Sequence, residues 1–470
     1  MSASGKPSSA VIVGLGRTGL SCARHLRSLG WRIAVTDTRA KPPELDRLRE
    51  LFPDVRVSVG GLDVRLLDDA VCVVASPGLS LKEPFFRQAV ARGLEIVGDI
   101  ELFARVVDAP VVGITGTNGK STVTTLVGRM AQRAGVRARA GGNLGEPALD
   151  LLGAGANTEL YVLELSSFQL DTTTSLDLRA ATVLNVTPDH LDRYSSVGEY
   201  ADAKARIFAR CDTAVINLDD PLVVAMPRPG QRTLGFSLRA AIGADYSCMA
   251  ESGLRPFQPA DQRRDFGPPA VASIDGDWWL ARRGEPLMKV AAMKIKGLHN
   301  AANALAALAL GEALALPLPA MLAELAEFPG LPHRSQWVAD VNGVAYINDS
   351  KGTNVGATLA AVGGMRGPLV MIAGGDGKNQ DFAPLAEAFR GKVRHTVLIG
   401  HDARAIGLAL QGVCAVEFCG TMEEAVRAAA RAAKPGDVVL LSPACASLDM
   451  FRDYTHRGAV FTQAVKELAA

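Results

Sequence analysis

The sequence has no excess of either charge. It contains 50 lysine and arginine residues against 49 aspartate and glutamate residues, which gives a formal net charge of +1. Proteins that bind nucleic acids or acidic membranes normally concentrate positive charge on one surface. The composition favours neither class, and we therefore expect no nucleic acid and no membrane among the binding partners.

Long apolar runs and closely spaced cysteines are also missing. The opening segment MSASGKPSS is polar, and the apolar run after it ends at Gly14, which is not the pattern of a signal peptide. No later run is long enough to span a bilayer. The seven cysteines show no C-x-x-C spacing. We therefore expect reduced thiols in a cytoplasmic protein.

What the sequence does contain is a strand–turn–helix pattern at Val111–Met130. An apolar strand precedes the turn Gly116-Thr117-Asn118-Gly119, and Lys120-Ser121-Thr122 begins a segment with helical spacing. Backbone N–H groups of such a turn converge on an anion, and the helix N-terminus adds partial positive charge. Lys120 would neutralise terminal phosphates, and the Ser121 hydroxyl would bind Mg²⁺. Ile114 replaces the first glycine of the strict phosphate-loop pattern, but the context still predicts a nucleoside triphosphate site.

At 470 residues, 48% of them hydrophobic, the chain is long enough for about three domains, and we expect the first at residues 1–98. There a strand leads into G-x-G-x-x-G, a helix follows, and a second strand ends at Asp37. This pattern is typical of dinucleotide binding, with Asp37 on a ribose hydroxyl. Nucleotide-sugar-binding and purely structural domains share it, and no histidine–aspartate pair suited to hydride transfer is evident. The pattern predicts nucleotide binding without specifying the nucleotide.

Polar side chains also accompany the predicted strands of residues 99–330. Glu164 lies within an apolar strand, where a carboxylate is costly unless it is bonded, so we expect a Mg²⁺ ligand beside the phosphate loop. His190 follows a strand predicted at residues 181–186, at the carboxyl end where ligands bind in α/β sheets. Lys204, on a helix predicted at residues 199–209, has by itself the features of a solvated lysine.

Two further segments complete this region. Asn300 and Asn303 lie one turn apart on a helix predicted at residues 299–313. They could contact an adenine edge, or they could simply cap the helix. Between residues 237 and 289 the pattern weakens, and residues 257–270 predict a surface loop.

Residues 331–470 predict a third parallel α/β sheet. Strands at residues 345–348, 369–373, 396–399 and 438–441 alternate with helical segments. Polar clusters follow three of these strands, at residues 349–354, 374–378 and 442–447. Their lysine, hydroxyl and aspartate side chains would share one edge of the sheet. This favours a site for an acidic substrate over a second ATP site, because no Lys-Ser begins a helix after residue 378.

Taken together, these stretches resemble the Mur ligases, and in particular the members that add D-glutamate. The matching segments are GLGRTGLS, GDIELF, GITGTNGKSTVTTL, GGNLG, LELSSFQL, NVTPDHLDRY, GLHNAANALAA, LPHRSQWV, NDSKGTN, GGDGKNQDF and LLSPACASLDMF. The resemblance implies three α/β domains: a Rossmann-like UDP-binding domain at residues 1–98, a central P-loop-type ATPase domain at residues 99–330, and a C-terminal Rossmann-like domain at residues 331–470.

The resemblance further implies an ATP-dependent amide ligase of peptidoglycan precursor synthesis. ATP would phosphorylate the carboxylate of UDP-N-acetylmuramoyl-L-alanine, and the amine of D-glutamate would attack the acyl phosphate. The expected cofactors are ATP and Mg²⁺ at two sites, and the expected state is a monomer. Two alternatives remain open: a related ligase that adds another amino acid or uses another acceptor, and an NAD-binding oxidoreductase or nucleotide sensor.

The resemblance also implies roles for individual residues. It assigns catalysis to Lys120, Glu164, His190 and Lys204. It assigns ATP binding to Gly116, Thr117, Asn118, Gly119, Lys120, Ser121, Thr122, Asn300, Asn303, Arg334, Asp349 and Lys351. It assigns the UDP-linked substrate to Leu15, Arg17, Thr18, Asp37, Arg39, Asn143 and His190, and glutamate to Thr353, Lys378, Ser447, Leu448 and Tyr454. It assigns the metal ions to Ser121, Glu164, His190 and a carbamylated Lys204. Gly352 and Tyr454 depart from the alanine and phenylalanine that are usual in this family.

Overall fold

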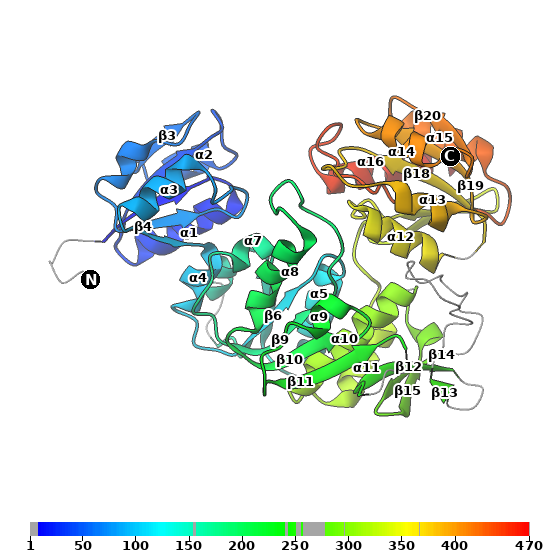
Figure 1. The fold of residues 1–470 in the computed structure, drawn as a ribbon, viewed down its shortest axis with the longest axis horizontal. Helices are drawn as coiled ribbons and strands as arrows, with labels where there is room; N and C mark the ends of the chain where they lie inside the picture. Colours follow the sequence, from blue (N-terminus) through cyan, green and yellow to red (C-terminus); the bar gives the residue numbers. More distant parts are fainter. Residues whose placement is uncertain are drawn as a thin grey trace.

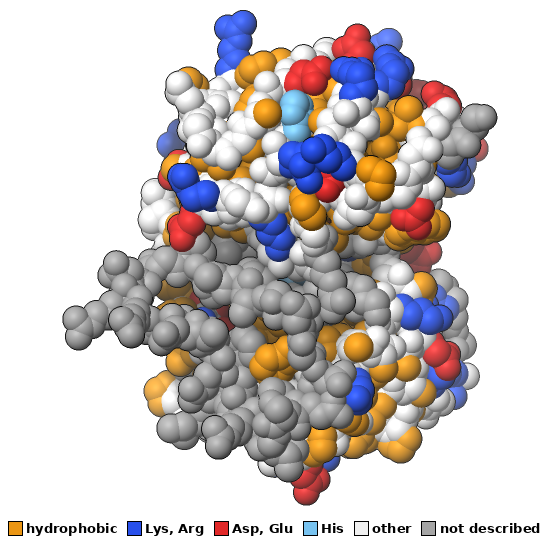
Figure 2. All heavy atoms as spheres, turned by 90° about the vertical axis from the view of Figure 1, so that its right-hand side faces the viewer, with side chains coloured by type: hydrophobic (Ala, Val, Ile, Leu, Met, Phe, Trp, Pro, Cys, Tyr) orange, Lys and Arg blue, Asp and Glu red, His pale blue; other side chains and the backbone are white. Residues whose placement is uncertain are grey.

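A computed structural model describes residues 8–153, 157–239, 243–250, 255–256, 278–295, 297–365 and 367–469. Three sheets follow one another along the chain, and Figure 1 shows the N-terminal and C-terminal sheets at opposite ends of the middle one. The surface loop predicted at residues 257–270 lies outside the described residues. Within them, no helix is both long and apolar enough to cross a membrane. On the face drawn in Figure 2, basic and acidic side chains are interspersed.

The N-terminal sheet is entirely parallel, with the order β3-β2-β1-β4-β5. The predicted β-α-β unit is confirmed, because a glycine turn joins β1 to an amphipathic helix, α1, that leads into β2. β5 was not predicted, since its three residues are too few to show a periodicity. The elements are β1 (Ser9–Val13), α1 (Arg17–Ser28), β2 (Arg32–Asp37), α2 (Leu45–Leu51), β3 (Arg56–Val59), η1 (Val64–Leu67), β4 (Cys72–Ala75), α3 (Pro84–Ala91) and β5 (Glu95–Val97).

The middle sheet combines a parallel part with an antiparallel extension, in the order β15-β14-β12-β11-β10-β9-β6-β8-β7, with β13 paired to β12. α10 is buried along most of its length and packs against α5 and against β9 to β12. The elements are α4 (Asp99–Ala104), β6 (Val111–Thr115), α5 (Lys120–Arg133), β7 (Ala138–Gly142), α6 (Ala148–Gly153), β8 (Leu160–Glu164), α7 (Ser167–Leu170), β9 (Leu178–Val183), α8 (Val197–Ala205), η2 (Arg206–Phe208), β10 (Cys211–Asn217), α9 (Pro221–Val224), β11 (Arg232–Ser237), β12 (Tyr246–Ala250), β13 (Arg255–Pro256), β14 (Trp278–Arg282), β15 (Glu285–Lys289), η3 (Val290–Ala292), α10 (Leu298–Ala313) and α11 (Leu318–Glu327).

Two boundaries in the middle domain differ from the prediction. The strand predicted at residues 181–186 begins and ends three residues earlier, as β9. Asn185 and Val186 leave the ladder because the Asn185 side chain accepts from the N–H of Asn118, and the N–H of Val186 donates to Asp220. The helix predicted at residues 199–209 begins at Val197 and tightens into η2, a 3₁₀ turn, after residue 205.

The C-terminal sheet has the order β16-β17-β21-β18-β19-β20. The predicted parallel sheet is confirmed for β17, β21, β18 and β19. β16 was not predicted, and it adds an edge to the sheet as an antiparallel hairpin with β17. Its turn is Asn342-Gly343, both at positive φ, a dipeptide that favours two-residue hairpins. The elements are β16 (Gln336–Val341), β17 (Val344–Asn348), α12 (Val355–Gly364), β18 (Leu369–Gly374), α13 (Ala383–Phe389), β19 (Val393–Ile399), α14 (Ala403–Ala409), β20 (Ala415–Phe418), α15 (Met422–Ala432), β21 (Val438–Leu441) and α16 (Tyr454–Ala469).

Candidate active site

The phosphate loop lies between β6 and α5 and is held by the segment that follows β9. The N–H of Asn118 donates to Asn185 Oδ1 at 2.9 Å, and the hydroxyl of Thr117 donates to the carbonyl of Thr187 at 3.2 Å. Gly119 has a φ of 86°, and a Cβ there would lie 2.3 Å from Asn303 Oδ1. The turn therefore requires glycine at this position, both for its backbone conformation and for the close approach of α10.

Two lysines converge on one carbonyl of this loop. Lys120 Nζ donates to the carbonyls of Gly116 and Thr117, each at 2.9 Å, and Lys204 Nζ donates to the carbonyl of Gly116 at 3.0 Å. Lys204 is only 1% exposed, so its interpretation as a solvated lysine is wrong. α8 turns this side chain inward, where it lies over the ring of Tyr200. Burial, and then the nearby charge of Lys120, lower the pKa of Lys204 well below its usual value.

Glu164, at the end of β8, is the centre of a chain of polar contacts. Ser121 Oγ donates to one carboxylate oxygen at 2.6 Å, and Asn143 Nδ2 donates to the other at 2.7 Å. A guanidinium N–H of Arg334 donates to Ser121 Oγ at 2.6 Å. The predicted Mg²⁺ ligands Ser121 and Glu164 are therefore in contact, and Arg334 brings a positive charge from residues that lead into the C-terminal sheet.

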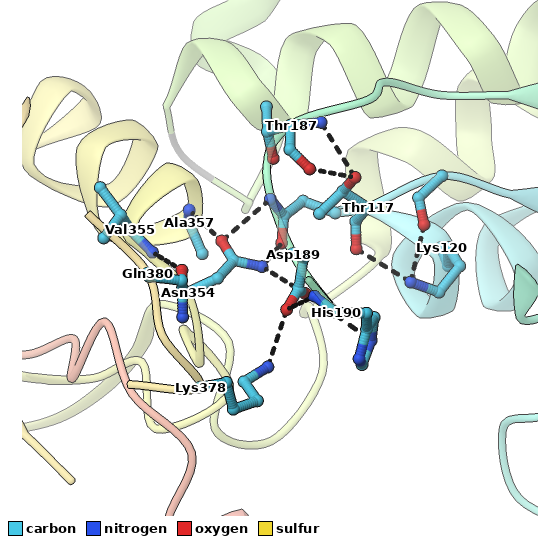
Figure 3. A network of polar contacts seen from close by, with 12 residues as sticks. Thr117, Lys120, Thr187, Asp189, His190, Asn354, Val355, Ala357, Lys378 and Gln380 are labelled. Carbon is cyan, nitrogen blue, oxygen red and sulfur yellow. Dashed lines mark hydrogen bonds and ion pairs between the residues drawn. The ribbon is translucent and has the colours of Figure 1, made fainter. Parts of the chain in front are cut away.

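Asp189 and His190 lie in the segment after β9, on the same side as Lys120 of the phosphate loop (Figure 3). Burial lowers the pKa of His190 to about 4, and its ring packs edge-on against Phe168 and Tyr200. Burial alone would raise the pKa of the Asp189 carboxyl, but Lys378 and His190 outweigh it and the pKa lies below its usual value. His190 and Lys378 both have positive φ, 56° and 52°. Non-glycine residues in this region are strained, and such strain gathers at functional sites.

A cleft beside the loop collects the residues predicted to bind the nucleoside. Asn303 donates to Asn300 at 3.2 Å within α10. Helix capping does not explain this pair, because the N-cap is Gly297 and no side chain caps the helix there. Across the cleft lies Asp349, and burial raises its pKa to about 6. Residues that line the cleft include Asn118, Phe236, Asn300, Asn303, Asp349 and Lys351.

Asp349 also explains the departure at Gly352. Ser442 Oγ donates to Asp349 Oδ2 at 2.8 Å. A Cβ on Gly352 would lie 2.7 Å from both of these oxygens. A methyl group at this position would therefore press on a buried hydrogen bond of the site.

The residues predicted to bind glutamate are distributed around the same edge of the C-terminal sheet. Lys378 Nζ donates to Asp189 Oδ1 at 2.7 Å, which joins the C-terminal domain to the middle domain. Ser447 is buried, whereas Leu448 is 72% exposed. Tyr454 places its ring 4.0 Å from Lys351 Nζ, so it contacts a lysine that was assigned to ATP. The Thr353 side chain is partly buried on the same loop as Lys351.

The residues predicted to bind UDP lie in the N-terminal domain. Asp37 accepts from the N–H of Leu15 at 2.7 Å and from the guanidinium of Arg39 at 2.7 and 2.9 Å. Although burial would raise the pKa of Asp37, these bonds bring it below its usual value. Arg17 is exposed and Thr18 partly buried in the first turn of α1. The glycine turn, β2 and α1 therefore meet at a single charged edge.

Sequence reasoning missed several residues that hold the site together. Asn185 and Asp189 lie in the matched segment NVTPDHLDRY, but no pattern in the neighbouring sequence indicates their contacts, because their partners are distant along the chain. Asn354 caps α12, and a cap could have been inferred from its position before an apolar helix. Arg457 is 1% exposed and donates to Ser350 Oγ and to the carbonyls of three residues; it thereby ties the loop after β17 to the loop after β21.

Three family models match this chain. They are the Mur ligase MurD-like N-terminal domain at residues 8–98, the Mur ligase middle domain at residues 114–311, and the Mur ligase glutamate ligase domain at residues 333–445. The chain belongs to the Mur ligase family. The family predicted from the motifs is therefore confirmed, as are its three α/β domains.

Relatives of this Mur ligase match it over nearly its whole length. It is 50% identical over 459 residues to the UDP-N-acetylmuramoylalanine–D-glutamate ligase of Methylococcus capsulatus, covering 98% of this chain and 95% of that one. It is 48% identical over 460 residues to the enzyme of the same name from Nitrosococcus oceani, covering 97% and 96%.

Solved structures of other Mur ligases share the fold. The UDP-N-acetylmuramate-alanine ligase of Thermotoga maritima superposes with a TM-score of 0.60 at 18% identity, covering 98% of this chain and 99% of that one. A pseudomurein peptide ligase from Methanothermus fervidus superposes with a TM-score of 0.56 at 18% identity, and the match covers 98% of this chain and 100% of that one. These likenesses show the shared fold.

The donor set at the phosphate loop fits Mg²⁺. This ion prefers oxygen ligands and is usually held by one or two carboxylates together with substrate phosphates and water. The contact between Ser121 and Glu164 supplies a hydroxyl and a carboxylate. Among the described residues, no three histidine, cysteine, aspartate or glutamate side chains gather as a ligand cluster. Ser121 and Glu164 are therefore the residues at this loop that could hold Mg²⁺.

Proposed function

We propose that this Mur ligase joins D-glutamate to UDP-N-acetylmuramoyl-L-alanine at the expense of ATP, with release of ADP and phosphate, in the cytoplasmic synthesis of peptidoglycan precursors. Residues 1–98 would bind the UDP portion, residues 99–330 ATP, and residues 331–470 glutamate and part of ATP. The observation that carries the proposal is the meeting of middle-domain and C-terminal side chains at one site, through Arg334 to Ser121 and through Lys378 to Asp189. Full-length identity of about 50% to ligases of this name supports the choice of substrates.

The reaction requires a carboxylate to become an electrophile. An oxygen of the alanine carboxylate attacks the terminal phosphorus of ATP, ADP leaves, and the resulting acyl phosphate is attacked by the glutamate amine with loss of phosphate and a proton. Both steps bring anions together, so positive charge must lie between them. Lys120, Arg334 and Lys351 supply that charge around the phosphate loop. Mg²⁺ held by Ser121 and Glu164 would screen the phosphates further.

After carbamylation, Lys204 would supply a ligand for a second Mg²⁺ ion. A protonated amine repels a cation and has no lone pair to offer it. The buried environment of Lys204 favours the neutral amine, which is the form that reacts with CO₂ to give a negatively charged carbamate. His190 would contact the same metal or the substrate, and Asn143 would face the muramoyl portion. These roles make Lys120, Glu164, His190 and Lys204 the proposed catalytic group.

Glutamate would be recognised mainly by charge. Lys378 can pair with one of its carboxylates, while Thr353, Ser447 and the backbone near Leu448 offer neutral donors to the other end. Tyr454 adds a ring and a hydroxyl at this edge. Glutamine and alanine lack the second carboxylate of glutamate, so they would forgo this charged contact and bind less well.

The test is ligation by the purified enzyme, which we expect to be a monomer. ADP release is measured with ATP, Mg²⁺ and UDP-N-acetylmuramoyl-L-alanine, with D-glutamate or L-glutamate in separate reactions. We expect release only when both the acceptor and D-glutamate are present. Release with another acceptor or amino acid would indicate a related ligase. No release, together with tight binding of NAD, would favour the oxidoreductase alternative.

A further inference from the structure

Asn354 occupies the junction between the C-terminal and middle domains (Figure 3). It is the N-cap of α12, and its Oδ1 accepts from the N–H of Ala357 at 2.8 Å. Its Nδ2 donates to Asp189 Oδ2 at 3.0 Å. The amides of Asn354 and Asn118 also lie within 3.4–3.5 Å of each other. One side chain, 2% exposed, thus touches a helix start, the phosphate loop and a buried carboxylate.

Helix capping accounts for the amide oxygen of Asn354 but not for its amide nitrogen. A cap needs an acceptor, and serine or aspartate supplies one as well as asparagine does. The other half of the amide is a donor, and it is directed at an anion of another domain. Aspartate at position 354 would cap α12 equally well but would place a second negative charge beside Asp189. The contact with Asp189 therefore requires an amide at position 354, whereas the cap of α12 requires only a hydrogen-bond acceptor.

The two oxygens of Asp189 have separate partners. Oδ1 accepts from Lys378 Nζ at 2.7 Å and from the N–H of His190 at 2.9 Å, whereas Oδ2 accepts from Asn354. A carboxylate that is bonded through both oxygens cannot rotate freely. Its orientation in turn fixes where the ammonium of Lys378 lies, since that contact crosses the domain boundary.

We propose that Asn354 is a positioning residue that holds Asp189, and through it Lys378, in the geometry that binds the incoming amino acid. Its contact with Asn118 makes this arrangement depend on the same loop that holds ATP. The inference rests on the proposed function, because glutamate is the substrate assigned to Lys378. It predicts that a change at Asn354 acts on the glutamate KM much more than on the KM of the UDP-linked substrate.

The test compares two variants that keep a cap with one control that removes a cap elsewhere. Asn354→Asp retains the acceptor but loses the donor and adds a charge, and Asn354→Ser retains a shorter acceptor. The control is Thr421→Ala, which removes the capping box of α15, where Thr421 Oγ1 accepts from the N–H of Glu424. Each KM is measured by ADP release, and each melting temperature by thermal unfolding.

We expect both Asn354 variants to raise the glutamate KM about ten-fold or more, since each loses a hydrogen bond to a charged group. Asn354→Ser, which keeps a cap and adds no charge, should melt closer to the parent protein than Asn354→Asp, which places a second carboxylate beside the buried Asp189. Thr421→Ala should lower the melting temperature and leave every KM unchanged. An unchanged glutamate KM in Asn354→Asp would overturn the inference and leave Asn354 as a helix cap. A parent enzyme without glutamate-dependent ADP release would instead refute the proposed function.

Discussion

Nζ of Lys378 lies 2.7 Å from Oδ1 of Asp189, and this contact pairs a cation of the C-terminal domain with an anion of the middle domain. Both side chains are largely buried, 18% and 8% exposed. The position of this ammonium therefore depends on how the two domains meet. A substrate carboxylate bound there would gain from a cation that is already partly stripped of water.

Lys378→Ala should raise the glutamate KM more than any other KM. Removing one partner of a buried charge pair typically costs about 2–5 kcal/mol, which corresponds to a loss of at least about 30-fold in kcat/KM for glutamate. The measurement is ADP release against glutamate concentration. Lys434→Ala, at an exposed position of the same domain, is the matched control. Equal effects of the two variants would contradict a role for Lys378 in glutamate binding.

Lys120→Ala should nearly abolish turnover while the protein stays folded. Its ammonium is the phosphate loop's own cation, and losing one such preorganised group typically costs about 100- to 1000-fold in kcat. The fold should persist, because the lost bonds go to two loop carbonyls at the edge of a cleft. Single-turnover ADP formation and a thermal melt test the two halves of the prediction. A folded variant with near-normal turnover would rule out the ATP assignment.

Lys204→Ala should be nearly inactive and partly restored by a small carboxylate such as acetate. The added carboxylate would occupy the space of the lost side chain and replace the charge of the carbamate. The measurement is ADP release with and without acetate. Lys204→Arg is the control, because it keeps a positive charge and its side chain fills the space that acetate would occupy, so acetate should not restore its activity. Normal activity of Lys204→Ala without acetate would exclude the carbamate.

ATP binding should take up a proton at alkaline pH. Burial lowers the pKa of Lys351 to about 8, so the free enzyme loses this positive charge as the pH rises through that value. Phosphates favour the charged form, so the pKa is higher in the complex. At pH values between the pKa of Lys351 in the free enzyme and its higher pKa in the ATP complex, the affinity for ATP should fall by up to about ten-fold per pH unit. Calorimetry in buffers of different ionisation enthalpy measures the uptake, and Lys351→Arg, always charged, should abolish it.

Arg39→Ala should weaken binding of UDP to the whole enzyme. Arg39 is half exposed and pairs with Asp37 at the edge of the N-terminal sheet, where a nucleotide would meet it. One exposed, solvent-screened contact of this kind suggests a loss of about ten-fold or less. Calorimetry with UDP measures the change, and NAD is added as a competitor. Tight binding of NAD, or a UDP affinity that does not change, would count against the assignment of this domain.

Much of the site could be predicted because parallel strands end at a common edge. The positions of Glu164, His190 and the polar cluster after β17 follow from strands that were recognised by their apolar runs. The contacts between domains could not be predicted in this way. Arg334 and Ser121 are 213 residues apart, and the local spacing of either residue says nothing about how the sheets are placed. The exposure of Lys204 was misjudged for a similar reason, since the burial of α8 depends on the elements that pack against it, α7, α9 and η2.

The close packing around Gly352 links two positions that lie 90 residues apart in the sequence, 352 and 442. A Cβ at residue 352 would approach the hydroxyl of Ser442 as closely as the carboxylate of Asp349. Which residue is tolerated at 352 therefore depends on what stands at 442, so the two positions form an epistatic pair. A chimaera that imports the loop after β17 from a relative with alanine there would have to import the partner position as well.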